Sequence, residues 1–174
     1  MTTVMLPAIG DQPTANDYDV VIDGPYARKG IRAFHIAPAD LEHARAFLLE
    51  RLPAKGAAMF DPLATTSGPL MELGCFVAHV FGVNEPRAAL AHRDVPLPYH
   101  VDTQSPYMCL NILVILAFGG IGADLVFPDE RVAVRTVDGL AVLFDGMNRL
   151  HGLTLFELAA PGSYRIGLTY YCPI

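Results

Sequence analysis

Apolar residues in the first half of the chain recur at helical spacing in two stretches. The first stretch ends at Pro53 and is expected to have its N-cap at residues 39–40; its apolar positions are Leu41, Ala44, Phe47, Leu48 and Leu52. The second stretch covers residues 69–83 and contains Gly74, a weak helix former; its apolar positions are Leu70, Leu73, Val77 and Val80. Short apolar runs at residues 18–22 and 30–35 predict strands, and residues 84–98 read as loop. We therefore expect one or two helices that pack on a sheet.

From residue 99 onward, the pattern changes to short runs rich in Val, Leu, Ile, Phe and Tyr, separated by Gly, Asp, Asn and Pro. These runs predict strands at residues 107–117, 124–127, 131–135, 140–144, 153–158 and 164–171. Closely spaced strands without intervening helices favour an antiparallel sandwich or barrel over a doubly wound sheet. The predicted fold class is α+β or mainly β. Three glycines are assigned to a turn or bulge, because no Walker lysine follows them: Gly119, Gly120 and Gly122.

The length of 174 residues and the hydrophobic content of 52% suit a single domain, with residues 1–95 as supporting elements and residues 96–174 as the core. A net charge of −6 argues against a nucleic-acid partner, although a base-flipping enzyme can carry a local basic groove on an acidic body. The N-terminal residues lack a secretory signal pattern, so we expect an intracellular location. No apolar stretch is long enough to span a membrane. The cysteines are interpreted as buried thiols: Cys75, Cys109 and Cys172.

A His-x-Asp motif from His100 to Asp102 opens the β-rich half, and a His-Gly pair follows far downstream at His151. Residues two apart in an extended segment point to the same side, so His100 and Asp102 can bind one ion. The intervening chain is long enough for several strands to bring His151 back to that ion. Two imidazoles and one carboxylate on one side of a metal form the ligand set of non-haem Fe(II) oxygenases. We predict a metal site at these three residues, and the same ligands also bind Mn, Co and Ni.

Arg165 lies in the last predicted strand. The alternation of side chains places it on the same face as Gly167 and Thr169, and the opposite face is apolar: Tyr164, Ile166 and Leu168. A guanidinium binds a carboxylate through two parallel hydrogen bonds, which a lysine cannot do. Arg165 is therefore the best candidate to bind the far carboxylate of a bidentate keto acid. The alternative is a surface salt bridge.

The order of His-x-Asp, distal His and Arg on a β-rich C-terminal half resembles the Fe(II)/2-oxoglutarate dioxygenases over about residues 99–173. The resemblance implies a double-stranded β-helix core, jelly-roll and cupin-like, with N-terminal strands and flanking helices. It implies that His100, Asp102 and His151 bind Fe(II) and that Arg165 anchors the co-substrate 2-oxoglutarate. The implied reaction uses dioxygen to hydroxylate a C–H bond while 2-oxoglutarate is decarboxylated to succinate. Asp102 favours hydroxylation, because related halogenases have a small residue at this position.

Within that superfamily, residues 119–153 look like the TET/JBP branch, which oxidises the methyl group of pyrimidines in nucleic acid. The similar run is a Gly-Gly pair, then an acidic residue, Leu, an apolar residue and Pro, followed by an apolar strand before the distal His-Gly. This chain departs from the pattern by an insertion, Ile121-Gly122-Ala123, between Gly119-Gly120 and Asp124. Prolyl hydroxylases share similar glycine-rich motifs, so the branch is less specific than the superfamily.

Several other polar residues fall near the predicted site. Candidates for hydrogen bonds to the co-substrate lie on or near core strands: Tyr99, Tyr107 and Asn111. His92 precedes the metal motif and is expected at the site entrance. The remaining histidines are not assigned to the metal: His35, His43 and His79.

Three alternatives to a nucleic-acid hydroxylase stay open. The substrate can be a small molecule or a peptide side chain instead of methylated nucleic acid. The chain can be a non-catalytic cupin-like sandwich that binds a metal or ligand without oxidising it. The iron can also use another reductant in place of 2-oxoglutarate, which would leave Arg165 with a structural role.

Overall fold

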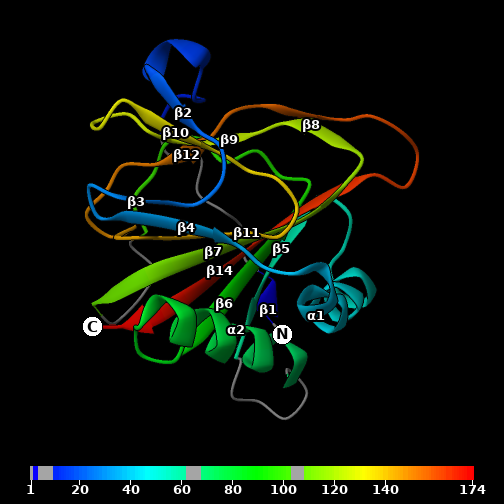
Figure 1. Cartoon of the computed structure of the whole chain (residues 1–174). Helices are drawn as coiled ribbons and strands as arrows, with labels where there is room; N and C mark the ends of the chain where they lie inside the picture. The colour runs from blue at the N-terminus through cyan, green and yellow to red at the C-terminus, as the bar shows by residue number, and fades with distance from the viewer. Residues whose placement is uncertain (1, 4–9, 62–67, 103–107) are drawn as a thin grey trace.

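The computed structural model describes residues 2–3, 10–61, 68–102 and 108–174. Figure 1 shows three layers, with two helices below a large sheet and a smaller sheet above it. The helices are α1 (Pro38–Arg51) and α2 (Gly68–Phe81), and a short 3-10 turn, η1 (Ala15–Asp17), precedes the first strand of the smaller sheet. The large sheet is therefore covered on both faces, by the two helices on one side and by the smaller sheet on the other.

The large sheet has eight strands among the described residues. In spatial order they are β1 (Thr2–Thr3), β5 (Gly56–Phe60), β6 (Ala88–Arg93), β14 (Tyr164–Pro173), β7 (Cys109–Phe118), β11 (Leu140–Phe144), β4 (Ile31–His35) and β3 (Tyr26–Arg28). The smaller sheet runs β12 (Gly152–Leu153), β9 (Asp124–Phe127), β10 (Val132–Arg135) and β2 (Val20–Ile22), and β13 (Phe156–Leu158) pairs with β8 (Gly120–Gly122). Among the described residues, all paired strands are antiparallel except β10 and β2, which are parallel.

Strand β14 separates two apolar cores. Alternate residues of β14, among them Ile166, Leu168 and Tyr170, lie on its lower face and pack against α1 and α2. Residues between them face the space under the smaller sheet, where side chains of β7, β9, β10 and β11 form the second core, including Leu113, Leu125, Val134 and Phe144. The period of two along a strand is what divides these residues between the layers. The predicted jelly-roll core with flanking helices is confirmed.

Most of the predicted strands are present, but β5 and β6 of the large sheet were not predicted. The predictions for residues 124–127 and 140–144 match β9 and β11, whereas residues 153–158 divide into β12 and β13. Residues 84–98 were read as loop, yet they contain β6, which pairs with β5 on one side and β14 on the other. Both missed strands are rich in alanine, which has a low strand propensity, and β6 is too fully buried to show alternation.

The helices differ from the prediction in two details. Helix α1 has its N-cap at Ala37, two residues before the expected position, because Pro38 occupies the first turn, where its fixed φ and missing N–H are tolerated. In α2, Val80 was expected on the packed face but is exposed, while Ala78 and Phe81 are buried. No helix in the described part of the chain is long and apolar enough to cross a membrane.

Two smaller expectations also need correction. The glycines after β7 were assigned to a turn or bulge; Gly119 does turn, with a φ of +65°, but the residues that follow it form β8. Cys109 and Cys172 are buried as expected, whereas Cys75 is only partly buried. Burial of Cys75 is incomplete because it lies on α2 between the packed and exposed faces.

We expect Gly74→Ala to destabilise the protein by about 1–2 kcal/mol. A Cβ at this position would lie 2.7 Å from Tyr170 Cε1 and 2.8 Å from Pro86 Cγ. Tyr170 cannot move easily, because it is fully buried and its hydroxyl donates to the Leu70 carbonyl at 2.6 Å. Overpacking costs about 1–3 kcal/mol, which exceeds the gain of about 0.5–1 kcal/mol from replacing a helical glycine.

Chemical denaturation of Gly74→Ala beside the wild type measures this effect. The matched control is Gly68→Ala in the same helix, where a Cβ meets no atom of the described residues within 4 Å. Equal stability of the two variants would contradict the proposed packing of α2 against β14.

Candidate metal centre

Two histidines from distant parts of the sequence are joined through their backbones. The His100 N–H donates to the His151 carbonyl at 2.9 Å, and the His151 N–H donates to the His100 carbonyl at 3.0 Å. His151 immediately precedes β12, so this bridge extends the edge of the smaller sheet. The two imidazole centroids lie 4.4 Å apart. The fold therefore brings the His-x-Asp motif and the distal histidine side by side.

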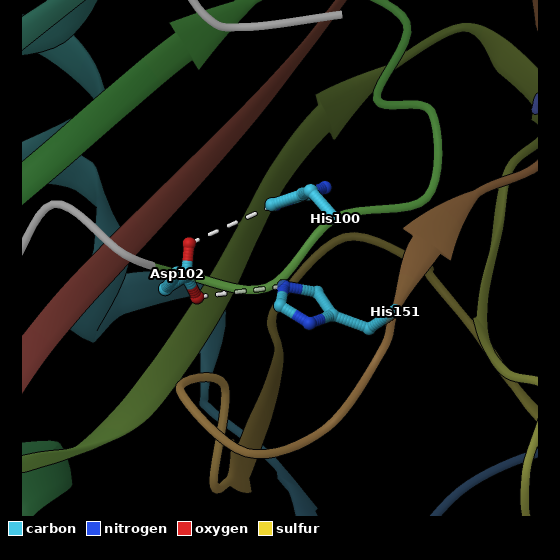
Figure 2. Close-up of side chains that lie close together, drawn as sticks. All are labelled: His100, Asp102 and His151. Carbon is cyan, nitrogen blue, oxygen red and sulfur yellow. Dashed lines mark ion pairs between the residues drawn. The ribbon is translucent and has the colours of Figure 1, made fainter. Parts of the chain in front are cut away.

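Asp102 completes a cluster with these two histidines. Its backbone N–H donates to the Gly146 carbonyl at 2.8 Å, which fixes the segment that carries the carboxylate. His100 Nε2 lies 3.7 Å from Asp102 Oδ1, and His151 Nε2 lies 3.4 Å from Asp102 Oδ2. Figure 2 shows both imidazoles turned toward this carboxylate. One atom from each residue lies within 4.8 Å of the others, and no other such group of His, Cys, Asp or Glu occurs among the described residues.

Hydrogen bonds fix the orientation of all three side chains. His100 Nδ1 lies 2.8 Å from the Pro98 carbonyl, and His151 Nδ1 lies 2.9 Å from the Arg149 carbonyl. A carbonyl only accepts, so each Nδ1 carries the proton and each Nε2 presents a lone pair to the cluster. The Asn111 amide on β7 donates to Asp102 Oδ2. This is the outer-shell support that metal-binding histidines and carboxylates require.

Burial shifts the protonation equilibria of Asp102 and His151 toward their neutral forms. Desolvation raises the pKa of Asp102 to about 6, against the lowering effects of His100 and the Asn111 hydrogen bond. Desolvation lowers the pKa of His151 to about 3, helped by the proximity of His100. A neutral imidazole is the form that binds metal. A divalent cation would in turn favour the ionised carboxylate.

A pocket between the two sheets opens onto the cluster. Its walls are mainly apolar, with a few polar groups that converge on the same space. The apolar residues are Leu90, Leu97, Val101, Leu113, Leu125, Phe144, Gly152 and Leu153; the remaining residues besides the cluster are His92, Thr169 and Tyr171. An apolar pocket with few convergent polar groups is typical of a small-molecule site.

Arg165 lies on the face of β14 that points into the space between the sheets. Its side chain is buried, with only 3% of the residue exposed, and its Nη2 donates to Thr136 Oγ1 at 3.2 Å. No described carboxylate forms an ion pair with this guanidinium, and its Nε has no hydrogen-bond partner among the described residues. Burial lowers its pKa to about 10, and nearby Asp94 opposes that shift. The alternative of a surface salt bridge is wrong, because the side chain is not at the surface.

The other predicted residues have different positions. Asn111 is fully buried and its amide is bonded to Asp102, so it supports the cluster directly. Tyr99 does not line the pocket; burial and nearby Asp17 raise its pKa. Tyr107 lies outside the described residues. The histidines that were not assigned to the metal are exposed and outside the cluster: His35, His43 and His79.

Two pocket residues were underestimated from the sequence. His92 was expected at the entrance, but it is 2% exposed and lies within the pocket wall. The sequence prediction could not place His92 in the wall, because His92 lies on β6 and that strand was not predicted. Tyr171 also lines the pocket, and the alternation that placed Arg165 and Thr169 on one face would have identified it.

Comparison with known proteins gives structural matches only. No protein-family model and no curated protein matches the sequence. A 2OG-Fe(II) oxygenase family oxidoreductase from Burkholderia pseudomallei is similar, with a TM-score of 0.61 and 17% identity over 84% of this chain and 86% of that one. NgTET1 in complex with 5mC DNA is also similar, with a TM-score of 0.58 and 11% identity over 88% of this chain and 81% of that one. The viral collagen prolyl hydroxylase vCPH from Paramecium bursaria Chlorella virus-1 has a TM-score of 0.57 and 12% identity over 84% of this chain and 98% of that one. The chain therefore has the fold of the 2OG-Fe(II) oxygenases.

Proposed function

We propose that this protein is an Fe(II)/2-oxoglutarate-dependent dioxygenase that hydroxylates a C–H bond. The observation that carries the proposal is the convergence of two imidazole Nε2 atoms and one carboxylate within 4.8 Å, at one end of a jelly-roll pocket. This donor set suits Fe(II) and leaves coordination positions for a co-substrate and dioxygen. His100, Asp102 and His151 would hold the metal.

The surroundings of Arg165 fit the second component, 2-oxoglutarate. A buried guanidinium without a carboxylate partner is unfavourable, because the charge loses its hydration without gaining an ion pair. A dicarboxylic keto acid that chelates the metal through one end can supply that partner with its other end. Arg165 would hold the distal carboxylate.

The residues of the chain have separate tasks in this reaction. When bound, Fe(II) and 2-oxoglutarate supply the oxidising chemistry, in which dioxygen hydroxylates a C–H bond and 2-oxoglutarate becomes succinate and carbon dioxide. The carbonyls of Pro98 and Arg149 hold the two imidazoles in one tautomer, and Asn111 orients the carboxylate of Asp102. The apolar walls exclude water, which protects the reaction from side reactions.

For the substrate, we propose the methyl group of a modified pyrimidine in nucleic acid. The support is the resemblance of residues 119–153 to the TET/JBP branch and the shared fold with NgTET1, which was crystallised with 5mC DNA. The net charge of −6 and the similar fold of a collagen prolyl hydroxylase favour the alternative, a small molecule or peptide side chain. Both substrate classes use the same metal site.

Anaerobic titration with Fe(II) and 2-oxoglutarate should produce the visible charge-transfer band of a chelated keto acid. We expect no band in His151→Ala, which loses a metal ligand. In Arg165→Ala, the band should appear only at a 2-oxoglutarate concentration at least about 30-fold higher. The reason is that loss of one partner of a buried charge pair costs about 2–5 kcal/mol.

The controls for this titration are His43→Ala and Arg51→Ala, on α1 beyond the large sheet, which should titrate like the wild type. Bound iron without a band in the wild type would remove 2-oxoglutarate from the mechanism. It would favour another reductant or a non-catalytic cupin-like sandwich.

Gly146→Ala should weaken Fe(II) binding by about 10–100-fold, the range for loss of outer-shell support. A Cβ at Gly146 would overlap the Asp102 carboxylate and lie 2.5 Å from Asn111 Nδ2. It would therefore separate the carboxylate from the amide that orients it. Competition with a chelating dye measures the affinity, with Gly68→Ala as control; unchanged affinity would contradict this role of Asn111 and Gly146.

Incubation with a methylated oligonucleotide should release succinate above the substrate-free rate, with a binding affinity that falls steeply as salt concentration rises. The salt dependence follows because phosphate contacts release counterions. Mass spectrometry of the base identifies the product, and the unmethylated oligonucleotide is the control. Succinate release with peptides or small molecules, and none with the oligonucleotide, would favour the alternative substrate class.

A further inference from the structure

His92 is a buried polar side chain without a hydrogen-bond partner in the described part of the chain. Its side chain lies in the pocket wall, only 2% of the residue is exposed, and neither Nδ1 nor Nε2 has a hydrogen-bond partner among the described residues. An unsatisfied buried polar group costs about 1–3 kcal/mol. Such groups are uncommon in native proteins and call for a specific explanation.

The sheet register places His92 between the metal cluster and Arg165. On β14, the residues that face the pocket side are Tyr171, Thr169, Gly167 and Arg165, at intervals of roughly 6–7 Å. Tyr171 pairs with Asn111, whose amide binds Asp102, and marks the metal end. His92 pairs with Gly167, one step from Arg165. Electrostatic effects of both Arg165 and His100 reach the imidazole, in agreement with this position.

Gly167 provides the space that the imidazole occupies. A Cβ at Gly167 would overlap the ring of His92, with Cε1 and Nε2 as the nearest atoms. Because Gly167 has no side chain, the imidazole of His92 can lie across β14 at this position. Burial, with contributions from Arg165 and His100, lowers the pKa of His92 to about 3, so the ring is neutral and keeps one N–H donor.

We propose that His92 donates a hydrogen bond to the distal carboxylate of the keto-acid co-substrate, the same carboxylate that Arg165 binds. The inference rests on the proposed function and adds a recognition residue to it. Arg165 and His92 are neighbours, both are buried, and both have polar atoms without hydrogen-bond partners among the residues that the structure describes. A carboxylate accepts about four hydrogen bonds, so a single anion satisfies both side chains.

The test compares two keto acids that chelate iron identically. 2-Oxoglutarate has the distal carboxylate, and 2-oxopentanoate has a methyl group in its place. We expect His92→Leu to weaken 2-oxoglutarate binding about 10- to 100-fold, as for loss of a hydrogen bond to a charged group. Binding of 2-oxopentanoate should not change. Anaerobic titration of the iron-loaded protein measures both affinities.

Two further variants and a stability measurement separate recognition from structure. His92→Gln keeps a side-chain donor and should recover part of the affinity for 2-oxoglutarate. The metal-free His92→Leu protein should be at least as thermally stable as the wild type, because the change removes unpaired buried polar atoms. His43→Leu, at an exposed position on α1, is the matched control and should alter neither property.

The outcomes distinguish this inference from the proposed function. If His92→Leu binds both keto acids as tightly as the wild type, or weakens both equally, the role of His92 is refuted while the dioxygenase proposal stands. If the iron-loaded wild type binds neither keto acid, the proposed co-substrate and the role of His92 both fail. Selective loss of 2-oxoglutarate binding in His92→Leu supports both.

Discussion

Strand β14 pairs with a neighbour on each side, and this double pairing positions both the apolar cores and the candidate site. This strand lies between β6 and β7, and its residues are buried on both faces along almost its whole length. One face packs against the two helices, and the other contributes Arg165, Thr169 and Tyr171 to the space between the sheets. A slip of one residue would exchange these faces and bring Ile166 into the place of Arg165. The apolar core therefore fixes the register of the site.

The backbone mainly sets the geometry of the His100–Asp102–His151 cluster. His100 and His151 are held by reciprocal peptide hydrogen bonds, and Asp102 is tied to the Gly146 carbonyl. Backbone carbonyls also set the tautomers of both imidazoles. Ligands held in this way need little rearrangement to receive a metal, which favours binding by lowering the ordering cost. The Asn111 amide is the side-chain contribution to this preorganisation.

The space between the two sheets contains polar groups whose burial is unfavourable for the protein alone. Arg165 lacks an ion-pair partner among the described residues, and His92 lacks hydrogen-bond partners there. Burial without partners destabilises the folded state, so such groups are expected where a ligand completes their interactions. Their positions along the inner face of β14 and β6 agree with the proposed anion-binding end, opposite the His100–Asp102–His151 cluster. The two ends together match a dicarboxylic keto acid better than a monocarboxylic one.

Residue types and their spacing were enough to predict the His100–Asp102–His151 cluster and much of the local structure. The His-x-Asp motif, His151 and the inward phase of Arg165 followed from residue type and from the period of two along a strand. Only the tertiary structure revealed that β6 is a central strand, that His92 lies in the pocket and that Asn111 binds Asp102. The physical reason is that periodicity and residue chemistry are local, whereas strand pairing joins segments far apart in the chain. The alanine-rich strand β6 is stabilised by pairing with β5 and β14, and its own residues do not indicate these partners.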